Sequence, residues 1–224
     1  YGLASTYFNS DQYGKAETQY KIYTDKLQGQ SSKENYDEAL LRLGDTQYVQ
    51  KKFANALNTF RRAVQERNQF SDYALFRAGV VLNFENRNTE AIQQLDEMIN
   101  NHPNSIYLAD AMFQKAQINM EENRFADARD GFTQLINTKS NSPFVPFALE
   151  GRAIANYSLK NYDETINDYK RILDQHPNAS NANAALVGLQ ETLSLQGRSG
   201  EFSKYLAAYR SSNPDNASLQ NIEF

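Results

Sequence analysis

Residues 36–64 read YDEALLRLGDTQYVQKKFANALNTFRRAV and contain two apolar stripes with helical spacing, separated by a short polar break. The two stripes are Leu40, Leu43, Gly44 and Tyr48, and then Phe53, Ala56, Leu57, Phe60, Ala63 and Val64. Steps of three and four positions place each set on one face of a helix. Residues 50–52 hold no apolar side chain, so the stretch predicts two antiparallel helices joined by a tight turn.

This helical hairpin recurs along the chain with a constant internal spacing. A small residue on the first helix is followed twelve positions later by a small residue on the second, and four positions after that by a large one. The three sets are Ala4, Gly44, Gly79, Ala116 and Ala153; Ala16, Ala56, Ala91, Ala128 and Thr165; and Tyr20, Phe60, Leu95, Phe132 and Tyr169. Successive hairpins start 40, 35, 37 and 37 residues apart, so length varies in the links, where loops tolerate it.

The pattern resembles the tetratricopeptide repeat (TPR), a helix–turn–helix unit of roughly 34 residues with aromatic-x2-Leu-Gly-x2-Tyr, then Ala-x3-Phe, then Pro. The matching positions are Leu43-Gly44, Ala56-x3-Phe60, Ala91-x3-Leu95 with Pro103, Ala128-x3-Phe132, and Tyr169 with Pro177. The chain departs from the pattern in having no Trp and in Asn88, which replaces an aromatic residue in the third hairpin. The resemblance implies an all-α fold, a right-handed α-solenoid in which hairpins stack on their neighbours.

We expect about six TPR-like hairpins in a single array over 1–224. Their expected ranges are 1–27, 33–68, 71–101, 105–138, 143–175 and 181–212, with 213–224 as the start of a further helix. The sixth is less regular, because Tyr205 stands where a small residue is expected. Since the sequence opens inside a repeat at Tyr1, we expect the array to be part of a longer one.

Two links between hairpins, NHPNSIYLADA at 101–111 and QHPNASNANAA at 175–185, are similar to those of bacterial cell-envelope TPR proteins. That subgroup includes outer-membrane-assembly lipoproteins and Tol–Pal-associated periplasmic proteins. The likeness implies a periplasmic or outer-membrane-associated location and leaves the cytoplasm open. No apolar run approaches the ~20 residues of a membrane-spanning helix, so we expect no transmembrane segment in this chain.

Composition argues against several function classes. The chain has 23 Lys and Arg against 27 Asp and Glu, a net charge of −4, without the basic stripe of a nucleic-acid-binding protein. It has no cysteine, and its two histidines, His102 and His176, are far apart and each precede proline, so no metal site is expected. Neither a glycine-rich phosphate loop nor a Ser/His/Asp order is present. We therefore expect no catalytic residue, no cofactor and no enzyme activity.

The TPR resemblance also implies where a protein or peptide partner would bind. In TPR arrays the first helix of each hairpin lines the concave side. Its groove positions lie three residues before the small residue and one, four and five residues after it. The partner-binding groove expected here consists of Leu41, Asp45, Tyr48, Phe76, Val80, Asn83, Phe84, Phe113, Gln117, Met120, Glu150, Ile154 and Tyr157. The subtype that grips a peptide carboxyl terminus has Lys at the last position, where Asn9, Val49, Phe84, Glu121 and Ser158 stand, so that subtype is not expected.

Three interpretations of these groove positions stay open. Many are apolar where a solvated face would be charged, which favours a scaffold that binds a partner segment. Alternatively the rings are core, and the array is a structural spacer or self-associates edge to edge. The third is a regulatory sensor of a small peptide, which would need polar side chains in the groove, and Asn83, Gln117 and Glu150 are the candidates.

Overall fold

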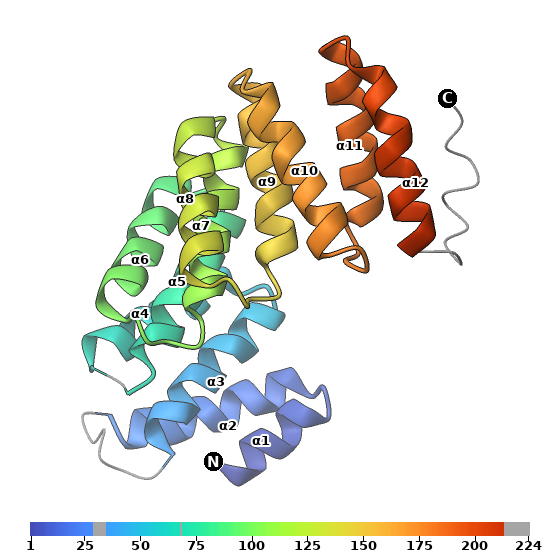
Figure 1. Cartoon of the computed structure of the whole chain (residues 1–224). Helices are drawn as coiled ribbons and strands as arrows, with labels where there is room; N and C mark the ends of the chain where they lie inside the picture. The colour runs from blue at the N-terminus through green and yellow to red at the C-terminus, as the bar shows by residue number, and fades with distance from the viewer. Residues whose placement is uncertain (29–34, 68, 213–224) are drawn as a thin grey trace. The chain divides into compact units, whose positions relative to one another are not determined.

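The computed structural model describes residues 1–28, 35–67 and 69–212, and these form α-helices and one short 3-10 helix, with no strand among them (Figure 1). The all-α class expected from the sequence is confirmed. Residues 33–34 and 68 of the second expected hairpin, and the helix expected at 213–224, lie outside the described residues.

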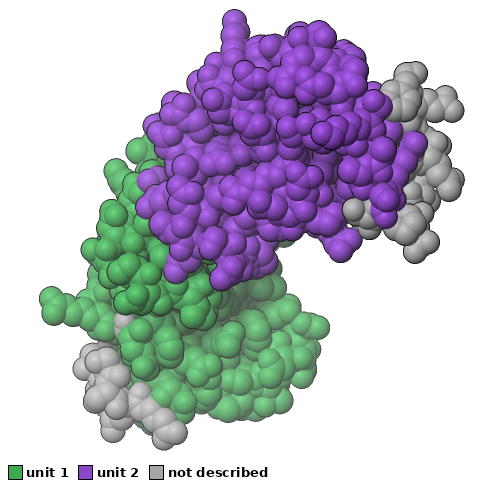
Figure 2. Space-filling model, in the orientation of Figure 1, with its two compact units in different colours: residues 1–111 green, residues 112–224 purple. Residues whose placement is uncertain are grey.

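The chain divides into two compact units, residues 1–111 and 112–224, which Figure 2 shows in green and purple. The first unit holds α1 (Gly2–Asn9), α2 (Tyr13–Lys26), α3 (Tyr36–Val49), α4 (Phe53–Gln65), α5 (Ser71–Phe84) and α6 (Asn88–Asn101). The division falls within α7 (Leu108–Glu121). The second unit continues with α8 (Phe125–Thr138), α9 (Val145–Ser158), α10 (Tyr162–Gln175), α11 (Ala182–Leu195), η1 (Ser199–Glu201) and α12 (Phe202–Ser212).

Within each unit, consecutive helices pack on one another, both inside a hairpin and from one hairpin to the next. In the first unit this holds from α1 to α6, and in the second from α8 to α12. Each hairpin therefore buries its apolar faces against its neighbours, as expected for a solenoid. Whether residues 1–224 form a single array stays a prediction.

The small residues of the repeat lie where two helices cross closely. Ala4, Ala16, Ala56 and Ala91 are fully buried. A Cβ added at Gly44 in α3 would lie 2.6 Å from Cε1 of the Phe60 ring in α4, so glycine permits this approach. Sequence spacing alone therefore identified the helix contacts of the hairpins.

Large residues four positions after the second small residue also join one hairpin to the next in the second unit. A Cβ added at Gly151 in α9 would lie 2.4 Å from Cζ of Phe132 in α8. One added at Gly188 in α11 would lie 2.5 Å from Cζ of Tyr169 in α10. These glycines let the following hairpin pack directly on an aromatic ring.

The turn inside each hairpin is the same in all six hairpins of the described residues. One residue after the helix cap adopts a left-handed conformation with φ between 57° and 67°: Asp11, Lys51, Asn86, Asn123, Lys160 and Gly197. The next N–H donates to the carbonyl five residues earlier at 2.7–2.9 Å. This is the Schellman motif, which satisfies carbonyl groups at the end of a helix. A fixed turn geometry explains why the twelve-residue spacing never varies.

This turn also corrects the register expected for the sixth hairpin. In the first five, the second small residue follows the left-handed residue by five positions, as Ala56 follows Lys51. Counting from Gly197 gives Phe202, not Tyr205. Phe202 is 2% exposed, and η1 precedes it in place of the first turn of an α-helix. The sixth hairpin therefore has a bulky residue, Phe202, where the others have a small one, and its second helix begins with a 3-10 turn.

Candidate functional site

The groove residues four positions after the small residue lie against the first residue of the next helix. Tyr48 meets Phe53 with ring centroids 5.7 Å apart, and Tyr157 meets Tyr162 at 5.5 Å, both edge to face. In the third hairpin, where Asn88 replaces the aromatic residue, Asn83 Nδ2 donates to Asn88 Oδ1 at 3.0 Å. Side chains at these positions therefore join the two helices of a hairpin and also remain partly exposed to solvent.

The groove residues three positions before the small residue contact the link that leads into the following hairpin. In the first unit, Phe76 stacks on Tyr107 with ring centroids 6.1 Å apart and planes 9° apart. In the second, Phe113 stacks on Phe144 at 5.1 Å, and Glu150 accepts a hydrogen bond of 2.8 Å from Asn181 Nδ2. This set packs between hairpins, and each of Phe76, Phe113 and Glu150 is half-buried.

Four apolar side chains at groove positions are exposed. In the first unit these are Val49 and Phe84, and Phe84 is 59% exposed although its ring lies 4.6 Å from that of Phe53. In the second unit they are Ile154 and Tyr157, which are 42% and 43% exposed. The remaining predicted residues Val80, Gln117 and Met120 are half-buried. The predicted groove thus contains both packed and exposed side chains.

A pocket of about 210 Å³ lies in the first unit beside Leu41 and Asp45, two of the predicted groove residues. Its other lining residues are Glu38, Arg42, Phe70, Tyr73 and Tyr107. Tyr73 and Tyr107 were not predicted. Tyr107 stands nine positions before Ala116, as Phe70 does before Gly79 and Phe144 before Ala153, so this recurring aromatic position was the available signal for it.

Asp45 is the charged centre of this pocket and is only 7% exposed. Tyr73 Oη donates to its two carboxylate oxygens at 2.9 Å each, and Arg77 Nε forms an ion pair with Oδ1 at 3.2 Å. Burial raises the pKa of the Asp45 carboxyl, while Arg77 and the Tyr73 hydrogen bond act in the opposite direction. Burial and the nearby Asp45 carboxylate raise the pKa of Tyr73.

Arg77 connects this acid to the surrounding rings. Its guanidinium lies 4.5 Å from the Tyr48 ring centroid and 5.8 Å from that of Phe60. Such cation–π contacts stabilise a cation over an aromatic face. The first unit therefore holds a buried carboxylate whose partner Arg77 is packed among aromatic rings.

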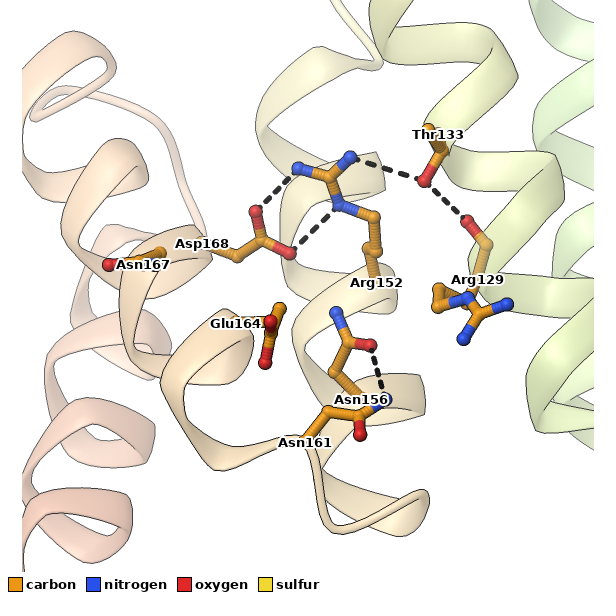
Figure 3. A pocket seen from close by; sticks show the side chains of 8 residues that line it. All are labelled: Arg129, Thr133, Arg152, Asn156, Asn161, Glu164, Asn167 and Asp168. Atoms are coloured by element: carbon orange, nitrogen blue, oxygen red, sulfur yellow. Dashed lines mark hydrogen bonds and ion pairs between the residues drawn. The ribbon is translucent and has the colours of Figure 1, made fainter.

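The second unit holds a different, polar pocket of about 450 Å³, which sequence analysis did not predict. It is lined by Arg129, Thr133, Arg152, Asn156, Asn161, Glu164, Asn167 and Asp168, from α8, α9, α10 and the turn between α9 and α10 (Figure 3). Arg152 and Asn156 take the positions where the TPR pattern has Leu and Tyr. That departure from the pattern was the signal that could have found this pocket.

Among the described residues, no group of three His, Cys, Asp or Glu side chains could hold a metal ion. Over the same residues, no helix combines the length and apolar character needed to cross a membrane.

Family models named tetratricopeptide repeat match most of the sequence. One matches residues 1–71 and 41–106, and a second matches 110–142 and 147–179. No curated protein matches this sequence.

Solved TPR structures resemble most of this chain at low sequence identity. A tetratricopeptide repeat protein from Parabacteroides merdae has a TM-score of 0.68 at 15% identity, covering 97% of this chain and 80% of that one. MamA has a TM-score of 0.66 at 15% identity, covering 82% and 95%. YrrB, described as a TPR protein with an unusual peptide-binding site, has a TM-score of 0.60 at 12% identity, covering 81% and 89%. Together with the helix order, these likenesses establish an all-α solenoid of helical hairpins.

Proposed function

Since this chain belongs to the tetratricopeptide repeat family, whose members mediate protein–protein interaction, we propose that it is a non-catalytic scaffold that binds a segment of a partner protein along its groove positions. The observation that carries the proposal is the exposure of apolar side chains at those positions. Phe84, Ile154 and Tyr157 remain open to solvent although the neighbouring rings are packed. Ile154 and Tyr157 lie one turn apart on α9, so their exposed apolar groups are adjacent, and contiguous exposed apolar groups are typical of partner sites.

The composition of the pocket at Asp45 is a second observation that supports partner binding. Its aromatic walls and its buried, hydrogen-bonded carboxylate combine an apolar lining with a fixed polar group, as ligand sites commonly do. YrrB carries a peptide-binding site on a similar fold, which is consistent with peptide recognition by this one.

A cell-envelope role is part of the proposal and rests on the sequence of the links at 101–111 and 175–185 alone. In that role the scaffold would assemble partners in the periplasm or at the outer membrane. Fractionation of the source cells, followed by immunodetection of the full-length protein, tests this location separately from binding.

The binding test places a photo-crosslinking phenylalanine analogue at position 84 or, as a control, at position 22. Ile22 in α2 is 57% exposed, nearly as much as Phe84, but lies on the second helix of its hairpin, away from the groove positions. We expect a defined crosslinked partner from position 84 in the source cells and none from position 22. Equal crosslinking from both positions, or none from position 84, would contradict the binding function.

A stability measurement accompanies the crosslinking. Phe84→Ser should cost about 1 kcal/mol, the value of one aromatic pair. Phe60→Ser, at a fully buried ring, should cost about 3–5 kcal/mol, the range for large aromatic truncations. If the urea midpoint of Phe84→Ser falls as far as that of Phe60→Ser, then Phe84 is core and the structural-spacer function takes precedence.

A further inference from the structure

The polar pocket of the second unit lies on the side of α9 opposite the predicted groove. At about 100° per residue, groove positions Glu150, Ile154 and Tyr157 fall about 40–100° from Ala153 in one direction around the helix. Arg152 and Asn156 fall about 60–100° away in the other direction. A ligand in this pocket would therefore leave the groove side of α9 free.

One ion pair, Arg152 with Asp168, lies inside the pocket, and Arg129 is paired with a residue outside its lining. Arg152 donates to Asp168 through Nε at 2.9 Å and through Nη2 at 2.6 Å, and its Nη1 donates to Thr133 Oγ1 at 3.2 Å. The ion pair is well shielded, with the two side chains 17% and 6% exposed. Arg129 is paired with the neighbouring Asp130 at 2.8 Å. The lining has two cationic and two anionic side chains, which favours a ligand without net charge.

Asn156 supplies a hydrogen-bond donor that the described residues do not use. It is 4% exposed, and its Oδ1 accepts a long hydrogen bond of 3.4 Å from Asn161 Nδ2. Its Nδ2 has no hydrogen-bond partner within the described ranges and points away from Asn161, toward the interior of the pocket (Figure 3). This donor reaches the open pocket, where the acceptor of a ligand would take the place of water.

The equivalent pocket of the first unit shows that this opening is not required by the fold. That pocket, of about 350 Å³, has Leu43 and Gln47 at the positions of Arg152 and Asn156. There Gln47 is held at both ends, because Thr59 Oγ1 donates to its Oε1 at 2.7 Å and its Nε2 donates to Glu17 at 3.4 Å. Of these two equivalent pockets, the one in the second unit has an amide nitrogen, Asn156 Nδ2, that no protein group in the described part of the chain occupies.

From these observations we propose that the pocket formed by α8, α9 and α10 binds the main chain of an extended peptide. Peptide groups offer one donor and one acceptor each, matching the amide side chains of Asn156, Asn161 and Asn167. None of the eight lining residues is aromatic, so a sugar ring would find no stacking surface. The volume lies within the roughly 300–1,000 Å³ of ligand pockets.

The test selects a random dodecapeptide phage library on the full chain, with counter-selection on Asn156→Tyr. Tyrosine is the residue of the TPR pattern at this position, so it should fill the pocket and keep the fold. Selected peptides are synthesised and their affinities measured by fluorescence polarisation, while thermal unfolding checks that each variant is folded. We expect binding to wild type and a loss of roughly tenfold or more with Asn156→Tyr.

Three further measurements make the outcome decisive. Asn167→Ala, at an exposed lining residue, should weaken binding without changing stability, which covers the case of a misfolded Asn156→Tyr. N-methylation of the central peptide bonds should weaken binding more than changes of side chain. Phe84→Ser should leave the affinity unchanged, which separates this site from the groove. Failure to enrich peptides on wild type over Asn156→Tyr, or equal affinity for the N-methylated peptides, would overturn the proposal.

Discussion

Gly44→Ala adds a single carbon at the crossing of α3 and α4, and we expect it to destabilise the protein although alanine favours the helix. The new Cβ would lie 2.6, 2.8 and 2.9 Å from three carbons of the Phe60 ring. Phe60 is fully buried, so its ring has no free space to move into. Either the ring leaves its favoured rotamer or the two helices separate.

The expected size follows from two opposing effects. Extra carbon in a packed core costs about 1–3 kcal/mol, and this short contact belongs to the upper part of that range. Replacing glycine by alanine inside a helix returns about 0.5–1 kcal/mol. The net loss should be about 1–2 kcal/mol. At about 2–4 °C per kcal/mol for a chain of this size, the melting temperature should fall by about 2–8 °C.

Gly14→Ala is the matched control, because Gly14 lies in α2 and an added Cβ would have no heavy atom within 4 Å. It should keep or slightly raise the melting temperature measured by circular dichroism. A double variant with Phe60→Leu should show that the cost of Gly44→Ala shrinks when the ring is removed. If Gly44→Ala is as stable as wild type while Gly14→Ala behaves as expected, the close contact between Gly44 and Phe60 is wrong.

Two further predictions test the turn and the polar pocket. Lys51→Gly, at φ 60°, should raise the free energy of unfolding by up to about 1 kcal/mol, whereas Lys52→Gly, at φ −87°, should lower it, and the same sign for both would argue against the left-handed turn. Asp168→Asn breaks a shielded ion pair and should cost about 3–5 kcal/mol in urea unfolding, while Asp130→Asn, at a residue whose side chain is 68% exposed, should leave the midpoint unchanged; a small effect of Asp168→Asn would mean that Arg152 finds another partner.

Much of the fold could be predicted because the repeat encodes its contacts as spacings. Ala16, Ala56 and Ala128 are buried where periodicity placed them. The Schellman turn was hidden, since its left-handed position holds Asp, Lys or Asn in five hairpins and Gly only at Gly197. Backbone geometry tolerates several residue types there, so composition carries little signal. Because the left-handed turn at Gly197 could not be recognised from the sequence, the position equivalent to Phe202 was placed at Tyr205.

The groove was harder to predict because spacing gives the place of a residue on its helix and does not give its neighbours. Spacing locates Phe76, Phe84 and Phe113 equally well, yet it cannot tell that Phe76 and Phe113 stack on link residues while Phe84 stays exposed. That difference depends on Tyr107 and Phe144, which each stand nine positions before the small residue of the following hairpin. The spacing of these link residues is regular, but only the structure shows that their rings fold back onto the preceding hairpin.

The constant turn also determines how the two proposed sites of α9 relate. The turn between α9 and α10 brings Asp168 against Arg152 in this structure. Asn156 lies on the same side of α9 as Arg152, so we expect a change there to alter the polar pocket and to leave the groove side in place. Tyr157 lies on the groove side, but its ring also contacts Tyr162, the first residue of α10, so we expect a change there to affect both the groove and the packing of α10 on α9. Variants at Asn156 therefore separate the two sites more cleanly than variants at Tyr157.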